Sequence, residues 1–151
     1  MNWAVHQDWM DRAIALAKEA GSAGEVPVGA MVVKGGELIA AAANRKERDH
    51  DPTAHAELLA LRYASKVLKT WHLGGCALYV TLEPCPMCAG AILHARIGRV
   101  FYGVDDPKTG ALRSAINLSR SPAAFHRVEV YGGIREQRCL QLIQSWFQLQ
   151  R

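Results

Sequence analysis

Two short segments, well separated in the chain, carry the side chains that most constrain the fold. The first is His55-Ala56-Glu57, and the second is Pro84-Cys85-Pro86-Met87-Cys88. Together they supply one imidazole, two thiolates and one further carboxylate. A tetrahedral zinc ion takes four ligands, so a site built from His55, Cys85 and Cys88 keeps its fourth position for water. The fold must therefore bring these two segments side by side.

The carboxylate of Glu57 is not needed as a ligand, which suggests a role in chemistry. Zinc lowers the pKa of a bound water to about 7. A carboxylate beside that water can take its proton, pass one to a ring nitrogen and then protonate departing ammonia. The spacing H-x-E followed by P-C-x-x-C is the signature of zinc nucleobase deaminases. We expect one zinc per subunit, with Glu57 as the catalytic residue.

Two other interpretations of the cysteines are weaker. A lone C-x-x-C is also found in structural zinc sites and in redox pairs. No second C-x-x-C or paired histidine completes a four-ligand structural site in this sequence. A redox pair would leave Glu57 without a role. The remaining cysteines, Cys76 and Cys139, lack ligand spacing, and we expect both to be buried thiols.

Length and composition indicate one globular domain over residues 1–151. Half of the residues are hydrophobic and 21% are charged, as in ordinary globular proteins. No apolar run approaches the roughly 18 residues of a membrane span, and the first residues lack the pattern of a signal peptide. We expect a cytoplasmic protein with no membrane contact. The net charge of +4 permits an anionic partner such as RNA.

The hydrophobic pattern predicts alternating helices and strands. Helical spacing covers residues 6–20, 54–69, 86–95 and 134–150, with Thr53 as the expected N-cap of the second helix. Strand-like runs cover 27–33, 38–43, 76–81, 99–102 and 127–131, and Gly35-Gly36 suggests a hairpin between the first two. This order predicts a three-layer α/β/α sandwich around a mixed sheet of about five strands.

This pattern puts the two ligand segments at helix starts. His55 and Glu57 fall in the first turn of one helix, and Cys85 and Cys88 in the first turn of another. Residues three apart share a helix face, so both cysteines can point at one ion. The positive ends of two helix dipoles at the same place favour thiolates over thiols.

The sequence resembles the bacterial tRNA-specific adenosine deaminases of the cytidine deaminase-like superfamily. The likeness runs through most of the chain. It is carried by Glu25-Val26-Pro27-Val28-Gly29-Ala30, Asn44-Arg45, Asp51-Pro52-Thr53-Ala54-His55-Ala56-Glu57, Leu78 to Ala91, Arg96 to Val100 and Asp106-Pro107-Lys108-Thr109-Gly110-Ala111. The zinc motif is shared with cytosine, cytidine and guanine deaminases. The segments 51–57 and 108–110 favour the tRNA enzymes.

The resemblance implies zinc-dependent hydrolytic conversion of adenosine to inosine at the wobble position of a tRNA anticodon. It implies that His55, Cys85 and Cys88 bind zinc and that Glu57 shuttles protons. The substrate-binding residues it implies are Asn44, Val28, Asp106, Ala54 and Pro84. It also implies a homodimer whose two subunits contact the tRNA anticodon loop.

Two alternatives to this function stay open at this point. One is a deaminase of a free nucleobase or nucleoside such as guanine or cytosine, and the other is an inactive zinc-bearing RNA scaffold. Glu57 argues against the scaffold, since an inert protein has no need of it. Phe125, Asp105 and the glutamines near the C-terminus depart from the family pattern, all in regions that would approach RNA.

Overall fold

A mixed five-stranded sheet forms the centre of the computed structural model, which describes residues 1–150. Its order is β2-β1-β3-β4-β5. The bounds are β1 (Gly29–Lys34), β2 (Glu37–Ala43), β3 (Cys76–Leu82), β4 (Arg99–Val104) and β5 (Glu129–Tyr131). Strand β1 runs antiparallel to β2 and β3, whereas β4 runs parallel to β3 and β5. The predicted mixed sheet is confirmed.

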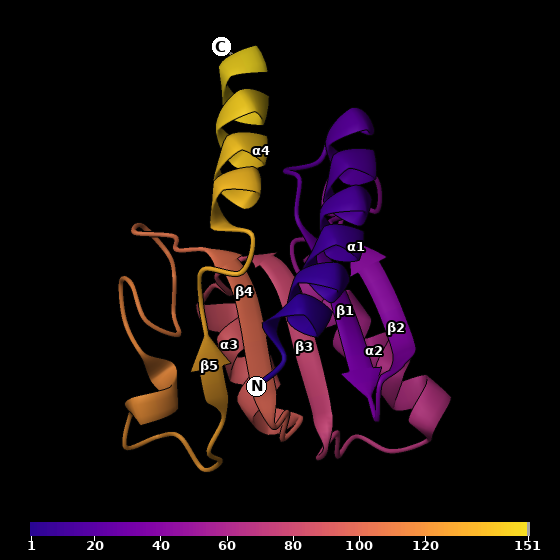
Figure 1. Cartoon of the computed structure of the whole chain (residues 1–151), viewed down its shortest axis with the longest axis vertical. Coiled ribbons are helices and arrows are strands. Elements are labelled where there is room, and N and C mark those ends of the chain that lie inside the picture. The colour runs from indigo at the N-terminus through magenta and orange to yellow at the C-terminus, as the bar shows by residue number, and fades with distance from the viewer. Residues whose placement is uncertain (151) are drawn as a thin grey trace.

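Helices cover both faces of this sheet, as Figure 1 shows. Helix α1 (Trp3–Ser22) lies in front of it, and α2 (Ala56–Leu68) and α3 (Pro86–His94) lie behind it. Helix α4 (Glu136–Leu149) rises beyond the upper edge of the sheet above β4, and Cys139 near its start packs into the same core as α1. The three-layer α/β/α sandwich is therefore confirmed. The single domain over residues 1–151 stays a prediction, and Arg151 lies outside the described residues. Within residues 1–150, no helix is long and apolar enough to cross a membrane.

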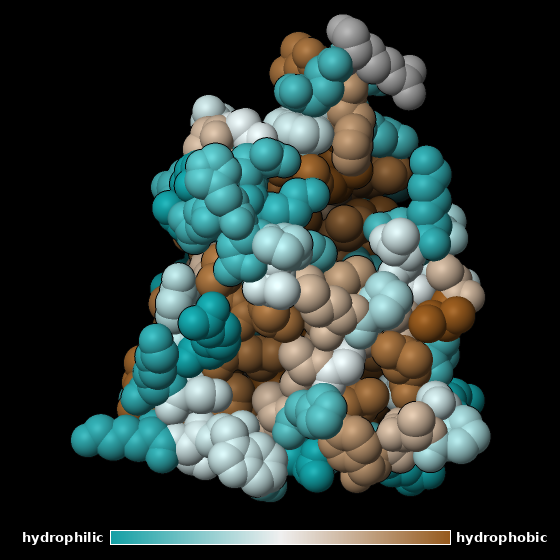
Figure 2. Space-filling view, turned by 180° about the vertical axis from the view of Figure 1, so that it is seen from behind, coloured by the Kyte–Doolittle hydropathy of each residue, from teal (hydrophilic) through white to brown (hydrophobic). Residues whose placement is uncertain are grey.

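The alternation of strand side chains produces one apolar core on each face of the sheet. On β3, Leu78 and Val80 pack into the core beneath α2 and α3, while Tyr79 packs into the core beneath α1. Phe101 of β4 joins Tyr79, with their rings stacked at 4.8 Å between centroids. On the α2 and α3 side, Figure 2 shows apolar side chains gathered over the middle of the molecular surface, with polar ones around them.

The hairpin between β1 and β2 depends on its two glycines. Gly35 and Gly36 have φ angles of 58° and 77°, in the left-handed region that glycine adopts without a steric penalty. They connect Lys34 and Glu37, which pair across the ladder. Positive φ at both central residues is the geometry of a two-residue turn that matches strand twist. The hairpin prediction is confirmed.

The prediction that Thr53 caps the second helix is wrong. Helix α2 begins at Ala56, and the capping position belongs to His55. The Asp51 carboxylate accepts hydrogen bonds from the backbone nitrogen and hydroxyl of Thr53, at 2.8 and 2.7 Å. This local turn competes with helix formation. It delays the helix by two residues, and His55 is thereby left with an extended backbone facing the next segment.

Gly29 offers a test of how closely α1 packs on the sheet. A Cβ added at this residue would collide with the carbonyl oxygen of Ala13 and lie 2.9 Å from the backbone nitrogen of Ala17. We expect Gly29→Ala to lower the free energy of unfolding by about 1–3 kcal/mol, because the backbone of α1 must shift. Chemical denaturation measures this change.

Gly90, inside α3, is the matched control. A Cβ added there meets no atom within 4 Å, and alanine is favoured over glycine in a helix by about 1 kcal/mol. Gly90→Ala should therefore keep or raise stability. Equal stability of the Gly29→Ala variant and the unmodified protein would contradict the close packing of α1 on β1.

Candidate active site

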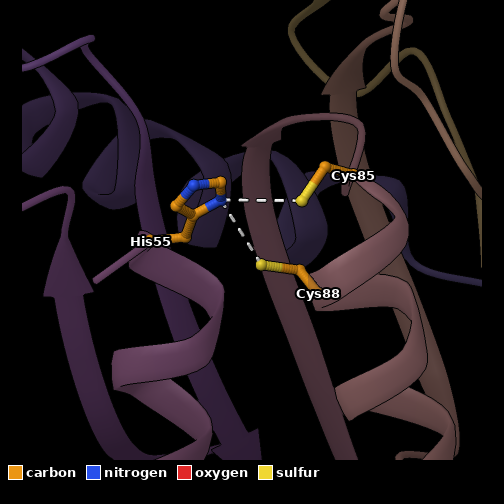
Figure 3. Close-up of side chains that lie close together, drawn as sticks. All are labelled: His55, Cys85 and Cys88. Carbon is orange, nitrogen blue, oxygen red and sulfur yellow. Dashed lines mark hydrogen bonds between the residues drawn. The ribbon is translucent and has the colours of Figure 1, made fainter. Parts of the chain in front are cut away.

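Three side chains that could hold a metal ion converge between the starts of α2 and α3 (Figure 3). His55 immediately precedes α2, Cys85 immediately precedes α3, and Cys88 lies in the first turn of α3. Both His55 and Cys85 have extended backbones, with ψ angles of 149° and 174°. Pro86 occupies the first position of α3, where its missing N–H costs no helical hydrogen bond. The local sequence thus decides the residue at which each helix begins, and the fold brings the two starts together.

The distances among these side chains fit a tetrahedral zinc ion. The Nδ1 atom of His55 lies 3.6 Å from the Sγ of Cys85 and 3.7 Å from the Sγ of Cys88. Zinc bound at usual lengths with tetrahedral angles separates such nitrogen and sulfur atoms by about 3.5 Å. All three ligand atoms lie within 4.8 Å of one another, and no other such group occurs within residues 1–150.

The protonation of these groups also suits a metal site. A hydrogen bond from Cys88, together with one from His55, lowers the pKa of the Cys85 thiol to about 4 against the opposing effect of burial. The hydrogen bond with Cys85 and burial both raise the pKa of Cys88. Cys85 is therefore a thiolate at neutral pH, and zinc binding must displace the proton of Cys88.

Glu57 is a buried carboxyl group next to this cluster. Its side chain lies in the first turn of α2, and the residue is 4% exposed. Burial raises its pKa to about 7, because a carboxylate loses its hydration there. A group with this pKa can both accept and donate a proton near neutral pH, as general acid–base catalysis requires.

The Asn44 side chain connects two segments beside the ligands. Its amide nitrogen donates to the carbonyl of Val26 at 2.9 Å, and its oxygen accepts from the backbone nitrogen of Ala56 at 2.8 Å. An amide group has two donor hydrogens and two acceptor lone pairs. One donor and one acceptor of Asn44 therefore stay available for a ligand.

A cavity of about 200 Å³ opens beside these groups. Its walls include the predicted Val28, Asn44 and Asp106, whereas Ala54 and Pro84 are buried and are not among the lining residues. The substrate-binding roles of these residues stay predictions. The complete lining consists of Gly24, Glu25, Val26, Val28, Asn44, Lys46, Glu47, His55, Glu57, Leu82, Glu83, Cys85, Asp106, Thr109 and Trp146.

Sequence reasoning missed several of these lining residues. Glu25 and Glu83 are 1% and 2% exposed, and acidic residues are so rarely buried that no pattern marked them. Glu25 accepts hydrogen bonds from the backbone nitrogens of Glu47 and Arg48, at 3.0 and 2.9 Å. Trp146 of α4 also lines the cavity, and no motif in the sequence marked it.

Comparison with known proteins gives consistent matches. Residues 4–145 match the family described as MafB19-like deaminase. The chain is 45% identical over 139 residues to a tRNA-specific adenosine deaminase of Bacillus subtilis (strain 168), covering 92% of this chain and 86% of that protein. It is 42% identical over 148 residues to one of Agrobacterium fabrum (strain C58 / ATCC 33970), covering 98% and 97%.

A solved structure agrees with these sequence matches. It comes from work described as "Biochemical and Structural Studies of A-to-I Editing by tRNA:A34 Deaminases at the Wobble Position of Transfer RNA". The superposition has a TM-score of 0.86 with 44% sequence identity, and it covers 88% of this chain and 96% of that one. The likeness in structure therefore extends over most of this chain.

Substitution of Cys88 tests the ligand set. We expect Cys88→Ser to reduce the zinc content well below one ion per chain, because a serine hydroxyl is a poor zinc ligand beside nitrogen and sulfur donors. Elemental analysis of the purified protein measures the zinc. Cys76→Ser is the control, since Cys76 is also buried but does not belong to the cluster. A full zinc complement in the Cys88→Ser variant would remove Cys88 from the ligand set.

Proposed function

The chain belongs to the tRNA-specific adenosine deaminases within the MafB19-like deaminase family, and we propose how its residues convert adenosine to inosine at the wobble position of a tRNA anticodon. The observation that supports the proposal most directly is the convergence of three zinc-ligand side chains with a buried carboxyl group. The two helix starts supply the ligands, and the buried carboxyl supplies the proton chemistry.

His55, Cys85 and Cys88 hold the zinc ion in this proposal, one ion per subunit. When bound, zinc supplies a water molecule whose pKa is lowered to about 7. The two cysteines share a face at the start of α3, and His55 approaches them from the start of α2. Because neither helix needs to move to complete the set, the ligand geometry is fixed by the fold.

Glu57 acts as the proton shuttle. Its burial keeps the pKa near 7, so the carboxyl group can take a proton from the attacking water and give one to a nitrogen of the purine ring. The same group then protonates the amine as it leaves as ammonia. Its placement two residues after His55 keeps it beside the metal site without occupying a ligand position.

The target base enters the cavity beside these groups. Asn44 offers its free donor and acceptor to the base, a pairing that suits the edge of adenine. Val28 forms part of the apolar wall, and Asp106 lies at the rim toward the ribose and backbone. The buried Ala54 and Pro84 belong to the segments that carry the zinc ligands. We propose that these two residues support the wall of the base-binding cavity beneath the lining side chains.

A deaminase of free guanine or cytosine shares the zinc chemistry and is the alternative. The relatives that match nearly the whole chain at 42–45% identity are tRNA-specific, so they favour the tRNA substrate. Incubation with an adenosine-bearing anticodon stem-loop, in parallel with free adenine, guanine and cytosine, separates the two functions. Inosine in the stem-loop is the expected product, and turnover of a free base alone would favour the alternative.

The Glu57→Gln variant tests the proton shuttle in the same assay. We expect it to retain zinc and to lose at least about 10²-fold in kcat, because the amide cannot transfer protons. Glu37→Gln removes the same charge from the exposed hairpin turn and should behave as the unmodified protein. Near-normal turnover by Glu57→Gln would exclude Glu57 from the mechanism.

We propose that the protein forms a homodimer through the face that carries α2 and α3. A groove of about 560 Å³ runs between these helices. Apolar side chains such as Leu58, Trp71 and Ala91 line it together with polar ones, which are Arg62, Ser65, Lys66, His94 and Arg96. Trp71, which lines the groove, is 64% exposed, and Figure 2 shows apolar side chains gathered on the side of the molecule that carries α2 and α3. Apolar patches of this kind on an isolated chain mark protein interfaces.

Substitution at the groove tests the dimer. We expect Trp71→Glu to shift the protein toward monomer in sedimentation velocity, because burial of an unpaired carboxylate in an apolar interface is costly. Leu149→Glu is the control, since Leu149 is highly exposed at the end of α4, outside the groove. A dimer unaffected by Trp71→Glu, or disrupted by Leu149→Glu, would place the interface elsewhere.

A further inference from the structure

Glu83 is a buried carboxylate that has no part in the zinc chemistry described above. It follows β3 directly and is 2% exposed. A buried carboxylate is costly unless hydrogen-bond donors surround it. It lies two residues before Cys85 in the chain, and its side chain is bonded to the loop that follows β4. The segment that supplies the hydrogen-bond donors to Glu83 is the segment that this carboxylate holds in place.

All five donors to the Glu83 side chain come from residues 106–114. One oxygen, Oε1, accepts from the backbone nitrogen of Asp106 at 3.0 Å and from the hydroxyl of Ser114. The other, Oε2, accepts from the backbone nitrogens of Leu112, Arg113 and Ser114, at 3.2, 2.9 and 2.9 Å. Both ends of this segment, which we call the rim loop, are thus tied to one carboxylate.

The rim loop packs directly against this carboxylate. A Cβ added at Gly110 would collide with the carboxyl group of Glu83, so only glycine allows this approach. The backbone nitrogen of Ala111 donates to the carbonyl of Pro84 at 2.8 Å. The loop is therefore attached to the same short segment, residues 83–85, that supplies a zinc ligand.

The middle of the rim loop faces the cavity. Asp106 and Thr109 line the cavity walls, and Lys108 between them is exposed. The Asp106 carboxylate accepts from the backbone nitrogens of Lys108 and Thr109 at 3.1 and 3.3 Å, so the loop closes into a tight turn at the rim. An exposed cationic side chain at this place suits the phosphates of a nucleic acid.

We propose that Glu83 is a positioning residue that holds the rim loop in the conformation that receives the tRNA backbone beside the target base, an inference that rests on the proposed function. The carboxylate fixes the loop during folding. The tRNA then binds a preformed edge, and the entropy of ordering the loop is not lost at binding. Glu83 itself touches neither the base nor the metal in this role.

The Glu83→Gln substitution tests this role with almost no change of shape. If the amide oxygen takes the place of Oε2, the amide nitrogen faces the backbone nitrogen of Asp106, and two donors then oppose each other. We expect faster hydrogen exchange of the amide at Asp106, by about tenfold, because it loses a hydrogen bond worth roughly 1.4 kcal/mol, whereas the amide at Arg113 keeps its acceptor. We also expect KM for the anticodon stem-loop to rise about tenfold, with kcat and zinc content nearly unchanged.

Two further variants keep the test decisive. Ser114→Ala removes one donor and leaves the carboxylate in place, so it should fold and give a smaller change of about threefold in KM. Glu37→Gln in the hairpin turn removes an equivalent charge and should change neither exchange nor KM.

The outcomes separate this inference from the proposed function. If unmodified protein fails to deaminate the stem-loop, the proposed function is wrong. If it succeeds and Glu83→Gln leaves the exchange of the rim loop and KM unchanged, Glu83 does not position the loop. If instead Glu83→Gln loses zinc and kcat at constant KM, Glu83 supports the metal site and the inference is overturned.

Discussion

The meeting of His55 with Cys85 and Cys88 is the contact on which the rest of this structure depends. It requires two helices, separated in the chain by strand β3, to begin at the same point on one side of the sheet. The turn at Asp51–Thr53 delays the first helix until Ala56, and Pro86 fixes the start of the second. The sandwich supplies the frame that holds these two starts together.

Three buried glutamates line the cavity, and they differ in the number of hydrogen-bond donors that each carboxyl group faces. Glu25 and Glu83 each accept several hydrogen bonds from the backbone of a loop, so they serve as anchors. Burial alone would raise the pKa of Glu25, but the hydrogen bonds from Arg48 and Glu47 hold it below its ordinary value. Burial dominates at Glu57 and raises its pKa to about 7. The same side chain thus anchors a loop or carries a proton, depending on how many donors face it.

Both anchored loops contribute residues to the wall of one cavity, with Lys46 and Glu47 from one loop and Asp106 and Thr109 from the other. Glu25 holds the segment that contains Lys46, and Glu83 holds the segment that contains Lys108. Both carboxylates are satisfied by backbone donors of the protein and hold the loops in place without a ligand. The buried Glu57 lines the same cavity as residues of these two loops.

The sequence by itself determined the sheet pattern, the Gly35-Gly36 turn and the candidate zinc ligands, because periodicity, turn glycines and ligand spacing are local properties of a chain. It misplaced the cap of α2, since Thr53 bonds to Asp51 instead. Only the tertiary structure decided that Glu25 and Glu83 are buried, that Trp146 lines the cavity and that Asn44 joins two segments. Those properties depend on hydrogen-bond donors and packing contacts from segments that are distant in the sequence. The spacing of residues along one segment therefore cannot predict them.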